Sequence, residues 1–239
     1  MLLQNGVRRS MDCEENMDRE KLVIIGAGGF SREIFWLVED INSVYGEWDI
    51  IGCIDDDISK KGSMVNHIPI LGDMSWFENT LSPVCAAIAV GDSVGRKKIA
   101  DKVMALSHVS FPNLIHPSVR LSKYVSMGHG NIVCCSSVLT VNITMESFNI
   151  INLNCTIGHD VSMGSFCTLA PSVNISGNVR LEDGCSLGTN CCIIPHKSVG
   201  GWSVIGAGAV VTSDIAPMCT AVGVPAKEIK NSYAGGELI

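Results

Sequence analysis

One histidine in the chain has a carboxylate as its immediate neighbour. His159 is followed by Asp160, and it comes directly after Gly158 and two residues after Ile157. An imidazole, whose ordinary pKa is about 6.5, can accept a proton at neutral pH, and a neighbouring carboxylate favours the imidazolium that results. The pair therefore has the composition of a general base. A lone histidine is more often structural, so the fold around it has to decide between the two roles.

A repeat of six residues positions this pair. Every sixth residue from Ile115 to Val211 is Ile, Leu, Val or Met, without an exception. An α-helix repeats at about 3.6 residues and a strand at about 2, so neither explains this period. A period of six is typical of a hexapeptide solenoid, whose short strands stack in successive coils. The residue two before each aliphatic is usually small or β-branched, which predicts a left-handed parallel β-helix. Ile157 then points inward, and His159 lies at a corner or on the outer surface of a coil.

The cysteines fit the same repeat. Four of the eleven occupy its inward small position, namely Cys155, Cys167, Cys185 and Cys191. A thiol there acts as a small hydrophobe, and the chain contains no Cys-x-x-Cys pair, so we expect neither disulfides nor a metal site. Unpaired cysteines indicate a reducing compartment, and we expect the protein to be cytoplasmic. Asn131 and Asn149 replace the small residue, and they are expected to stack as an amide ladder or to face an open side.

The residues before the repeat follow a different pattern. Residues 21–25 form an apolar run that ends at a turn with Gly26, Gly28 and Gly29, and an amphipathic stretch follows. Two further apolar runs, 50–54 and 84–90, end in polar residues, and a second helix is expected from about 93 to 106. Alternating strands and helices predict a small parallel sheet of Rossmann type with three or four strands.

The ends of these three strands are the candidate nucleotide site. Ligands of open α/β sheets lie beyond the carboxyl ends of the strands, and a helix N-terminus after a glycine turn can hold phosphate. The turn is an incomplete dinucleotide fingerprint, because Ser31 stands where a glycine is expected. A purely structural turn therefore stays an alternative, and a nicotinamide cofactor is disfavoured. The candidate binding residues are Gly28, Gly29, Phe30, Asp55, Asp56, Gly91 and Ser93.

Composition narrows the classes of partner. The formal net charge of −7 argues against nucleic acid as a partner. No apolar run reaches the roughly 18 residues of a membrane span, and the first residues do not resemble a signal peptide. Residues 1–20 are polar with charges of both signs, and they are expected to form a disordered extension.

Five motifs, in this order, resemble the bacterial nucleotide-sugar N-acetyltransferases that act on amino sugars, which have the sialic-acid O-acetyltransferases as relatives. The motifs are residues 26–31 (GAGGFS), 54–56 (IDD), 89–93 (AVGDS), 152–160 and 222–227 (VGVPAK). The resemblance covers roughly residues 20–230. It implies a Rossmann-like nucleotide-sugar domain at 21–111, a left-handed β-helix at 112–216 and a C-terminal segment at 217–239.

The resemblance also implies roles for individual residues. In this family the β-helix forms a homotrimer, and acetyl-CoA lies in the groove between neighbouring subunits. His159 matches the catalytic histidine, Asp160 the acidic residue beside it, and Asn152 lies in the matching substrate motif. Some members carry a second histidine that contacts acetyl-CoA; here Thr168 stands in that place, and its hydroxyl could donate a hydrogen bond. The other implied acetyl-CoA contacts are Gly177, Thr189, Gly206 and Ala207.

Three functions remain to be weighed. The first is an acetyl-CoA-dependent N-acetyltransferase that acts by direct transfer on a UDP-, GDP- or dTDP-linked amino sugar, with His159 as base. The second is an O-acetyltransferase with a sialic acid or another hydroxyl as acceptor. The third is a hexapeptide protein that binds without catalysis or carries a metal. His129 and His159 are 30 residues apart, which is not a whole number of three-hexad coils, so they are expected on different faces. The nucleotide-type domain favours the first function.

Overall fold

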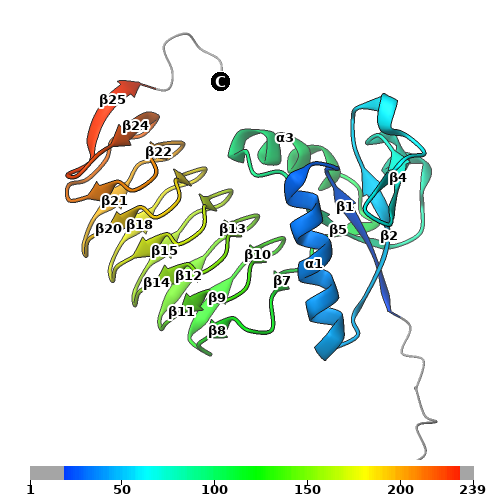
Figure 1. Ribbon diagram of the computed structural model, residues 1–239, viewed down its shortest axis with the longest axis horizontal. Helices are drawn as coiled ribbons and strands as arrows, with labels where there is room; N and C mark the ends of the chain where they lie inside the picture. The colour runs from blue at the N-terminus through cyan, green and yellow to red at the C-terminus, as the bar shows by residue number, and fades with distance from the viewer. Residues whose placement is uncertain (1–18, 232–239) are drawn as a thin grey trace, which may run out of the picture.

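The computed structural model describes residues 19–231 in two parts (Figure 1). An α/β domain comes first, and a left-handed parallel β-helix follows it. A disordered extension was expected at residues 1–20. Of these, residues 1–18 lie outside the described residues, and Glu20 already belongs to strand β1 (Glu20–Ile25). Within residues 19–231 no helix combines the length and the apolar character that crossing a membrane requires.

The N-terminal sheet has six strands, in the order β3-β4-β2-β1-β5-β6, with only the β3–β4 pair antiparallel. The expectation of three or four strands was wrong, because β3 and β6 are only two residues long and give no apolar run. The remaining strands are β2 (Trp48–Ile54), β3 (Met64–Val65), β4 (Ile68–Gly72), β5 (Val84–Ile88) and β6 (Val109–Ser110). The helices are α1 (Gly29–Val44), η1 (Ile58–Lys60), α2 (Ser75–Asn79) and α3 (Ser93–Val103).

Alternate residues of β1 face two different layers. Leu22 and Ile24 pack in the cluster that contains the apolar face of α1, whereas Val23 and Ile25 pack with Ala100 of α3. A parallel sheet covered on both faces needs strands that are apolar throughout, and this explains the continuous runs of β1 and β5. Because β1, β2 and β5 are parallel neighbours, their carboxyl ends meet at one edge of the sheet. The three predicted nucleotide-binding segments all begin there.

The β-helix has three faces, and each face gains one parallel strand every 18 residues, as in the pairing of Ile132 with Ile150. The first face contains β7 (Leu114–Ile115), β10 (Ile132–Val133), β13 (Ile150–Ile151), β16 (Thr168–Leu169), β19 (Ser186–Leu187), β22 (Val204–Ile205) and β24 (Cys219–Val222). The second contains β8 (Arg120–Leu121), β11 (Val138–Leu139), β14 (Thr156–Ile157), β17 (Asn174–Ile175), β20 (Cys192–Ile193) and β23 (Val210–Val211). The third contains β9 (Val125–Met127), β12 (Ile143–Met145), β15 (Ser162–Met163), β18 (Arg180–Leu181) and β21 (Ser198–Val199).

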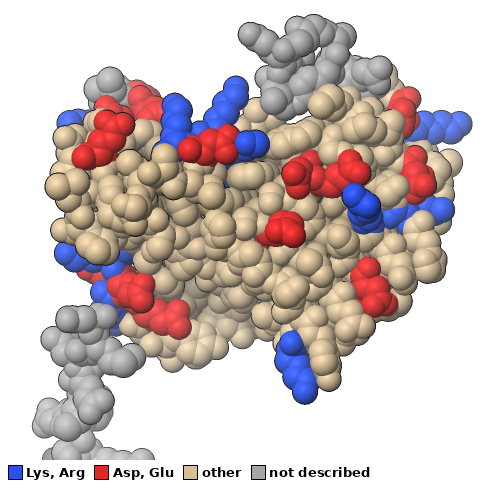
Figure 2. Space-filling view, turned by 180° about the vertical axis from the view of Figure 1, so that it is seen from behind, with Lys and Arg blue, Asp and Glu red and all other residues tan. Residues whose placement is uncertain are grey.

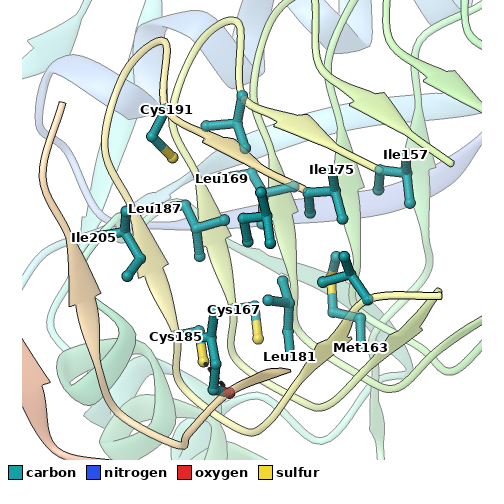
Figure 3. Packing of buried hydrophobic residues seen from close by; sticks show 14 of the residues in the cluster. Ile157, Met163, Cys167, Leu169, Ile175, Leu181, Cys185, Leu187, Cys191 and Ile205 are labelled. Carbon is teal, nitrogen blue, oxygen red and sulfur yellow. Dashed lines mark hydrogen bonds between the residues drawn. The ribbon is translucent and has the colours of Figure 1, made fainter. Parts of the chain in front are cut away.

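The aliphatic residues of the repeat form the core of the β-helix, except Leu121 of the first coil, which is exposed (Figure 3). Ile157, Leu169 and Leu187 are buried in one cluster, and each such side chain contributes about 1.5–3 kcal/mol when removed from water. The inward cysteines belong to the same cluster, as Figure 3 shows for Cys167, Cys185 and Cys191. Burial raises the pKa of the Cys191 thiol to about 12, so it stays protonated. The interpretation of these cysteines as small hydrophobes is confirmed.

The two inward asparagines form an amide ladder. Asn131 Oδ1 accepts a hydrogen bond from Asn149 N at 2.8 Å, and Asn149 Oδ1 accepts one from Cys167 N at 2.7 Å. Both asparagines are buried. Each amide thus links its own coil to the next, which is the first of the two arrangements that the sequence suggested.

The β-helix continues beyond residue 216. Strand β24 pairs in parallel with β22, and β25 (Lys227–Asn231) pairs antiparallel with β24. Within the predicted C-terminal segment at 217–239, strands β24 and β25 therefore extend the first face, and residues 232–239 lie outside the described residues.

The α/β domain packs on the first face of the β-helix, where α1 lies beside β7 (Figure 1). The outward residues of this face form a column in which Leu114, Ile132 and Ile150 are buried against α1. The next two residues of the column are Thr168 and Ser186. The column is therefore apolar where it faces α1, and it carries hydroxyl groups where it faces the start of α3.

Candidate active site

His159 lies at the corner between the second and third faces, directly after β14 and Gly158. Its Nδ1 is 2.7 Å from Oδ2 of Asp160, and Asn142 Nδ2 donates to the other carboxylate oxygen at 3.1 Å. Asp160 adopts the left-handed conformation with φ of 58°, which Asp and Asn tolerate better than most residues. This backbone conformation lets adjacent side chains form a hydrogen bond.

The hydrogen bond determines the state of the imidazole. A carboxylate can only accept, so Nδ1 carries the proton and Nε2 of the neutral ring keeps its lone pair. Hydrogen bonding to His159, and next to Asn142, lowers the pKa of Asp160, which keeps this carboxylate ionised at neutral pH. The His159 side chain is 59% exposed, so a second molecule can reach the ring. The pair has the geometry of a general base with an oriented ring.

Gly177, one coil further on, makes room for this ring. A Cβ atom at position 177 would lie 2.5 Å from two atoms of the His159 imidazole, Cε1 and Nε2. Any side chain here would push the ring away from its position. We name the group formed by Asn142, His159, Asp160 and Gly177 the catalytic corner, for the role that we propose for it.

The glycine turn leaves open space at the start of α1. A Cβ at Gly28 would meet nothing within 4 Å, and one at Gly29 would approach only the end of Arg32. Ser31 donates its hydroxyl proton to Gly26 O at 2.7 Å, so it closes the turn from within. Gly28 and Gly29 therefore present backbone N–H groups at a helix N-terminus, as an anion site requires.

The two acidic residues after β2 differ in availability. Asp55 Oδ2 accepts from Ala27 N at 3.0 Å and from Lys60 Nζ at 3.1 Å, and Oδ1 accepts from Asp57 N at 2.9 Å. Asp55 thus ties the glycine turn to its own loop. Asp56 is exposed, and its Oδ1 accepts a long hydrogen bond of 3.4 Å from Met74 N. Of the pair, Asp56 is the better placed to bind a ribose hydroxyl.

The turn after β5 meets the first face of the β-helix. Gly91 O accepts a hydrogen bond from the Thr168 hydroxyl at 2.9 Å, and Ser93 Oγ lies 3.3 Å from Thr168 Oγ1 and 3.2 Å from Ser186 Oγ. The Ser93 side chain is buried. Both hydroxyls, one predicted to bind substrate and the other acetyl-CoA, therefore serve the contact between the two domains. Gly91 itself has open space where a Cβ would stand.

The other predicted cofactor residues lie at a different corner from His159. Thr189, Gly206 and Ala207 follow strands of the first face, as does Asn152, so they belong to the corner between the first and second faces. Thr189 and Ala207 are exposed, whereas Asn152 is half-buried with its Oδ1 accepting from Leu153 N. Phe30 and Leu153 both pack against the apolar cluster between α1 and the first face.

The structure thus divides the predicted site residues between opposite sides of the β-helix. The α/β domain covers the first face, and the corner of His159 is the vertex opposite that face. One chain therefore presents a nucleotide-type site on one side and the catalytic corner on the other. His129 follows β9 of the third face, so the expected separation of the two histidines is confirmed.

One residue at the domain contact, Arg96 of α3, was missed in the sequence. Its guanidinium is buried and bonds to both domains. The available signal was its place four residues before Ala100 and seven before Val103, on the apolar stripe of α3. A cation on such a stripe needs internal partners.

The described residues include no cluster suited to a metal ion, and the face seen in Figure 2 carries charges of both signs. Among residues 19–231, no group of three or more His, Cys, Asp or Glu is arranged to hold a metal ion. Acidic and basic side chains are interspersed on the face shown in Figure 2, and much of the surface between them carries neither charge.

Comparison with known proteins gives the same combination of domains. Residues 21–103 match the family model of the PglD N-terminal domain. The acetyltransferase domain of PglB from Neisseria gonorrhoeae FA1090, solved with acetyl coenzyme A, is 30% identical; the match covers 88% of this chain and 100% of that one, with a TM-score of 0.80.

Two further relatives are perosamine N-acetyltransferases. PerB from Caulobacter crescentus, solved with CoA and GDP-perosamine, is 29% identical over 88% of this chain and 97% of that one, with a TM-score of 0.79. The GDP-perosamine N-acetyltransferase of Escherichia coli O157:H7 is 25% identical over 219 residues, which are 87% of this chain and 96% of the relative. The likeness extends over both domains, and the chain belongs to the nucleotide-sugar N-acetyltransferases of the hexapeptide-repeat family.

Proposed function

We propose that this protein transfers the acetyl group of acetyl-CoA to the amino group of a nucleotide-linked amino sugar. The observation that carries this proposal is the catalytic corner, in which Asp160 orients the exposed ring of His159 through Nδ1, so that Nε2 is the nitrogen that can accept a proton. The open glycine turn and the exposed Asp56 supply a nucleotide-type site. Relatives of the same architecture were solved with acetyl coenzyme A or with CoA and GDP-perosamine.

The proposed reaction is a direct transfer. The neutral amine attacks the thioester carbonyl carbon, a nitrogen–carbon bond forms, and the amine proton moves to His159 Nε2. The carbon–sulfur bond then breaks, and CoA leaves as the thiolate. Throughout the reaction, Asp160 accepts a hydrogen bond from Nδ1–H of His159, and the charge of the carboxylate stabilises the imidazolium. We assign His159 the role of base and Asp160 that of orienting it.

The test uses purified protein, acetyl-CoA and a panel of UDP-, GDP- and dTDP-linked sugars with amino groups at different positions. Mass spectrometry identifies the acetylated product, and turnover is then measured with saturating substrates. For His159→Ala we expect kcat to fall about 10²- to 10⁴-fold. His129→Ala is the matched control, because this exposed histidine lies at another corner. Turnover by His159→Ala close to that of the wild type would remove His159 from the role of base.

The opposite positions of the two half-sites support a homotrimer. The acceptor bound by the α/β domain of one chain lies on the side away from that chain's own His159. If three chains pack side by side around an axis, the catalytic corner of one comes next to the α/β domain of another, and the two half-sites complete each other. Light scattering then gives a mass three times the 25.5 kDa of one chain.

Mixed trimers test the sharing of the site directly. His159→Ala removes the base, and Gly28→Glu places an acidic side chain in the open space at the glycine turn. Each variant alone is expected to be inactive. Refolded or co-expressed together in equal amounts, they regain about a quarter of wild-type activity, because a quarter of the sites combine two intact halves. Two inactive variants that stay inactive in mixed trimers would contradict a shared site.

We also place the protein in the cytoplasm. The support is chemical: Cys155, Cys167, Cys185 and Cys191 are packed as thiols in the core of the β-helix, and such thiols persist in a reducing compartment.

A further inference from the structure

We propose that Arg96 is a positioning residue, which holds the substrate-binding turn after β5 in a fixed place relative to the β-helix. This inference rests on the proposed function. Arg96 lies in the second turn of α3, and its side chain is 1% exposed. It has no part in the proposed proton transfer, so its burial calls for a different explanation.

The guanidinium bonds to both domains at once. On the side of the α/β domain, Nη1 donates to Val90 O at 2.8 Å and to Gly91 O at 3.0 Å. On the side of the β-helix, Nε donates to Phe148 O at 2.9 Å, and Nη2 donates to Phe166 O at 2.7 Å and Cys167 O at 3.1 Å. A single planar group therefore connects the turn to two successive coils.

Thr168 closes the network through its hydroxyl. Its Oγ1 accepts from Arg96 Nη2 at 2.8 Å and lies 2.9 Å from Gly91 O, to which its proton is donated. Gly91 O thus receives hydrogen bonds from Arg96 and Thr168, one from each domain. The orientation of this peptide is determined by the contact between the domains and not by the turn alone.

The partners of Arg96 are dipoles and not a carboxylate. Its hydrogen bonds go to five carbonyl oxygens and one hydroxyl, and Asp92 acts only as a nearby charge. Burial lowers the pKa of Arg96 to about 10, so the group stays protonated at neutral pH. Holding a charge in this way costs desolvation, and well-packed apolar residues generally stabilise a contact at least as well. What the guanidinium adds is five donors in one rigid plane, which define a geometry.

This geometry is expected to affect binding of the nucleotide sugar and not binding of acetyl-CoA. The turn at Gly91 lies at the carboxyl end of β5, next to the glycine turn, where a Cβ at Gly26 would lie 3.0 Å from Ala89 O. The catalytic corner is on the far side of the β-helix. The residues predicted to bind acetyl-CoA at 189, 206 and 207 follow β19 and β22, whereas Arg96 bonds to residues 148 and 166–168 of the β-helix. Loosening Arg96 is therefore expected to disturb binding of the nucleotide sugar while leaving acetyl-CoA and the imidazole in place.

The experiment compares Arg96→Met and Arg96→Lys with the wild type, with Arg180→Met as a control for an exposed arginine on the third face. For Arg96→Met we expect the KM for the nucleotide sugar to rise at least about tenfold, and the KM for acetyl-CoA to change less than about twofold. Arg96→Lys should lie between, because an ammonium keeps the charge but cannot span both groups of carbonyls. Guanidinium ions at low millimolar concentration should partly restore Arg96→Met. An unchanged KM for the sugar, or an equal change for both substrates, would overturn the proposal.

Hydrogen–deuterium exchange separates this inference from the proposed function. In both Arg96 variants, exchange at residues 89–93 should rise more than exchange at residues 157–160, whatever the substrate proves to be. Arg96→Lys supplies this measurement should Arg96→Met fail to fold. If the wild type acetylates no nucleotide sugar, the proposed function fails, and the exchange result still decides on the coupling. Equal exchange at residues 89–93 in wild type and variants would disprove it.

Discussion

Two polar clusters on the outside of the β-helix differ in how far their hydrogen-bonding groups are already used. At the catalytic corner, the imidazole of His159 is bonded to Asp160 through Nδ1, and the side chain is largely exposed. At the domain contact, Thr168, Ser93 and Arg96 are bonded to one another or to carbonyl groups. Both clusters stand on the same regular coils. A polar side chain on this scaffold therefore keeps free hydrogen-bonding groups where no second domain covers it.

A change at Gly177 tests the most sensitive point of the catalytic corner. In Gly177→Ala, the new Cβ would lie 2.5 Å from the imidazole, so the ring of His159 has to move. We expect kcat to fall about 10²-fold, because a displaced base no longer reaches the amine. Steady-state kinetics with saturating substrates measure the effect. Gly201→Ala is the control, since a Cβ there would be 3.3 Å from its nearest neighbour, Asp183 O, at another corner.

Asp160→Asn tests the orientation and charge supplied by the carboxylate. The variant should lose about tenfold in kcat, because an amide keeps the shape but presents either a donor or an acceptor to Nδ1. The hydrogen bond from His159 lowers the pKa of Asp160, so this group is ionised throughout the neutral range and does not cause the acidic limb of the pH–rate profile. We expect the pH–rate profile of Asp160→Asn to differ from that of the wild type, because the anion beside the proposed base is absent.

Asp214→Asn is the control for the pH measurement. Asp214 is also exposed, and a hydrogen bond from Ser198 N lowers its pKa, but it lies away from His159. This control should keep both the turnover and the pH–rate profile of the wild type. A profile unchanged in Asp160→Asn as well would show that the carboxylate does not act on the base.

Thr168→Val is expected to have the smallest effect and tests the other side of the comparison. The change removes the hydroxyl that joins Arg96 to Gly91 O, and it leaves the outline of the side chain. We expect the KM for the nucleotide sugar to rise about two- to fivefold and the free energy of unfolding to fall by about 1–2 kcal/mol. Thr156→Val, at an exposed hydroxyl of the second face, is the control. A rise in the KM for acetyl-CoA instead would restore the role that the sequence suggested for Thr168.

Much of the architecture could be predicted because the responsible signals are local. Every sixth residue from Ile115 to Val211 occupies the same place in its own hexad, and three hexads form one coil, so the period of the sequence reports the period of the fold. The strands of the α/β domain were recognised where both of their faces are buried, as in β1 and β5. Strands β3 and β6 were not, because two residues carry no pattern, and a neighbour in the sheet is what makes them strands.

The candidate site could be predicted in part. The neighbours His159 and Asp160 were found because their interaction is encoded in adjacent residues. Asp55 and Asp56 look alike in the sequence, and only the contacts with Ala27 and Lys60 distinguish the bound carboxylate from the available one. Arg96 was missed because all of its partners on the β-helix lie at least 52 residues away.

The β-helix, the position of His159 at an outer corner and the order of the two domains could be predicted from the sequence alone. These features depend on interactions within one coil or between neighbouring residues. Because the pattern repeats, the weak preferences of the single coils for this conformation add up. Which polar groups are hydrogen-bonded at the domain contact, and which stay free, became clear from the tertiary structure. That outcome depends on how the α/β domain sits on the first face, and buried polar groups must find their partners wherever the chain brings them.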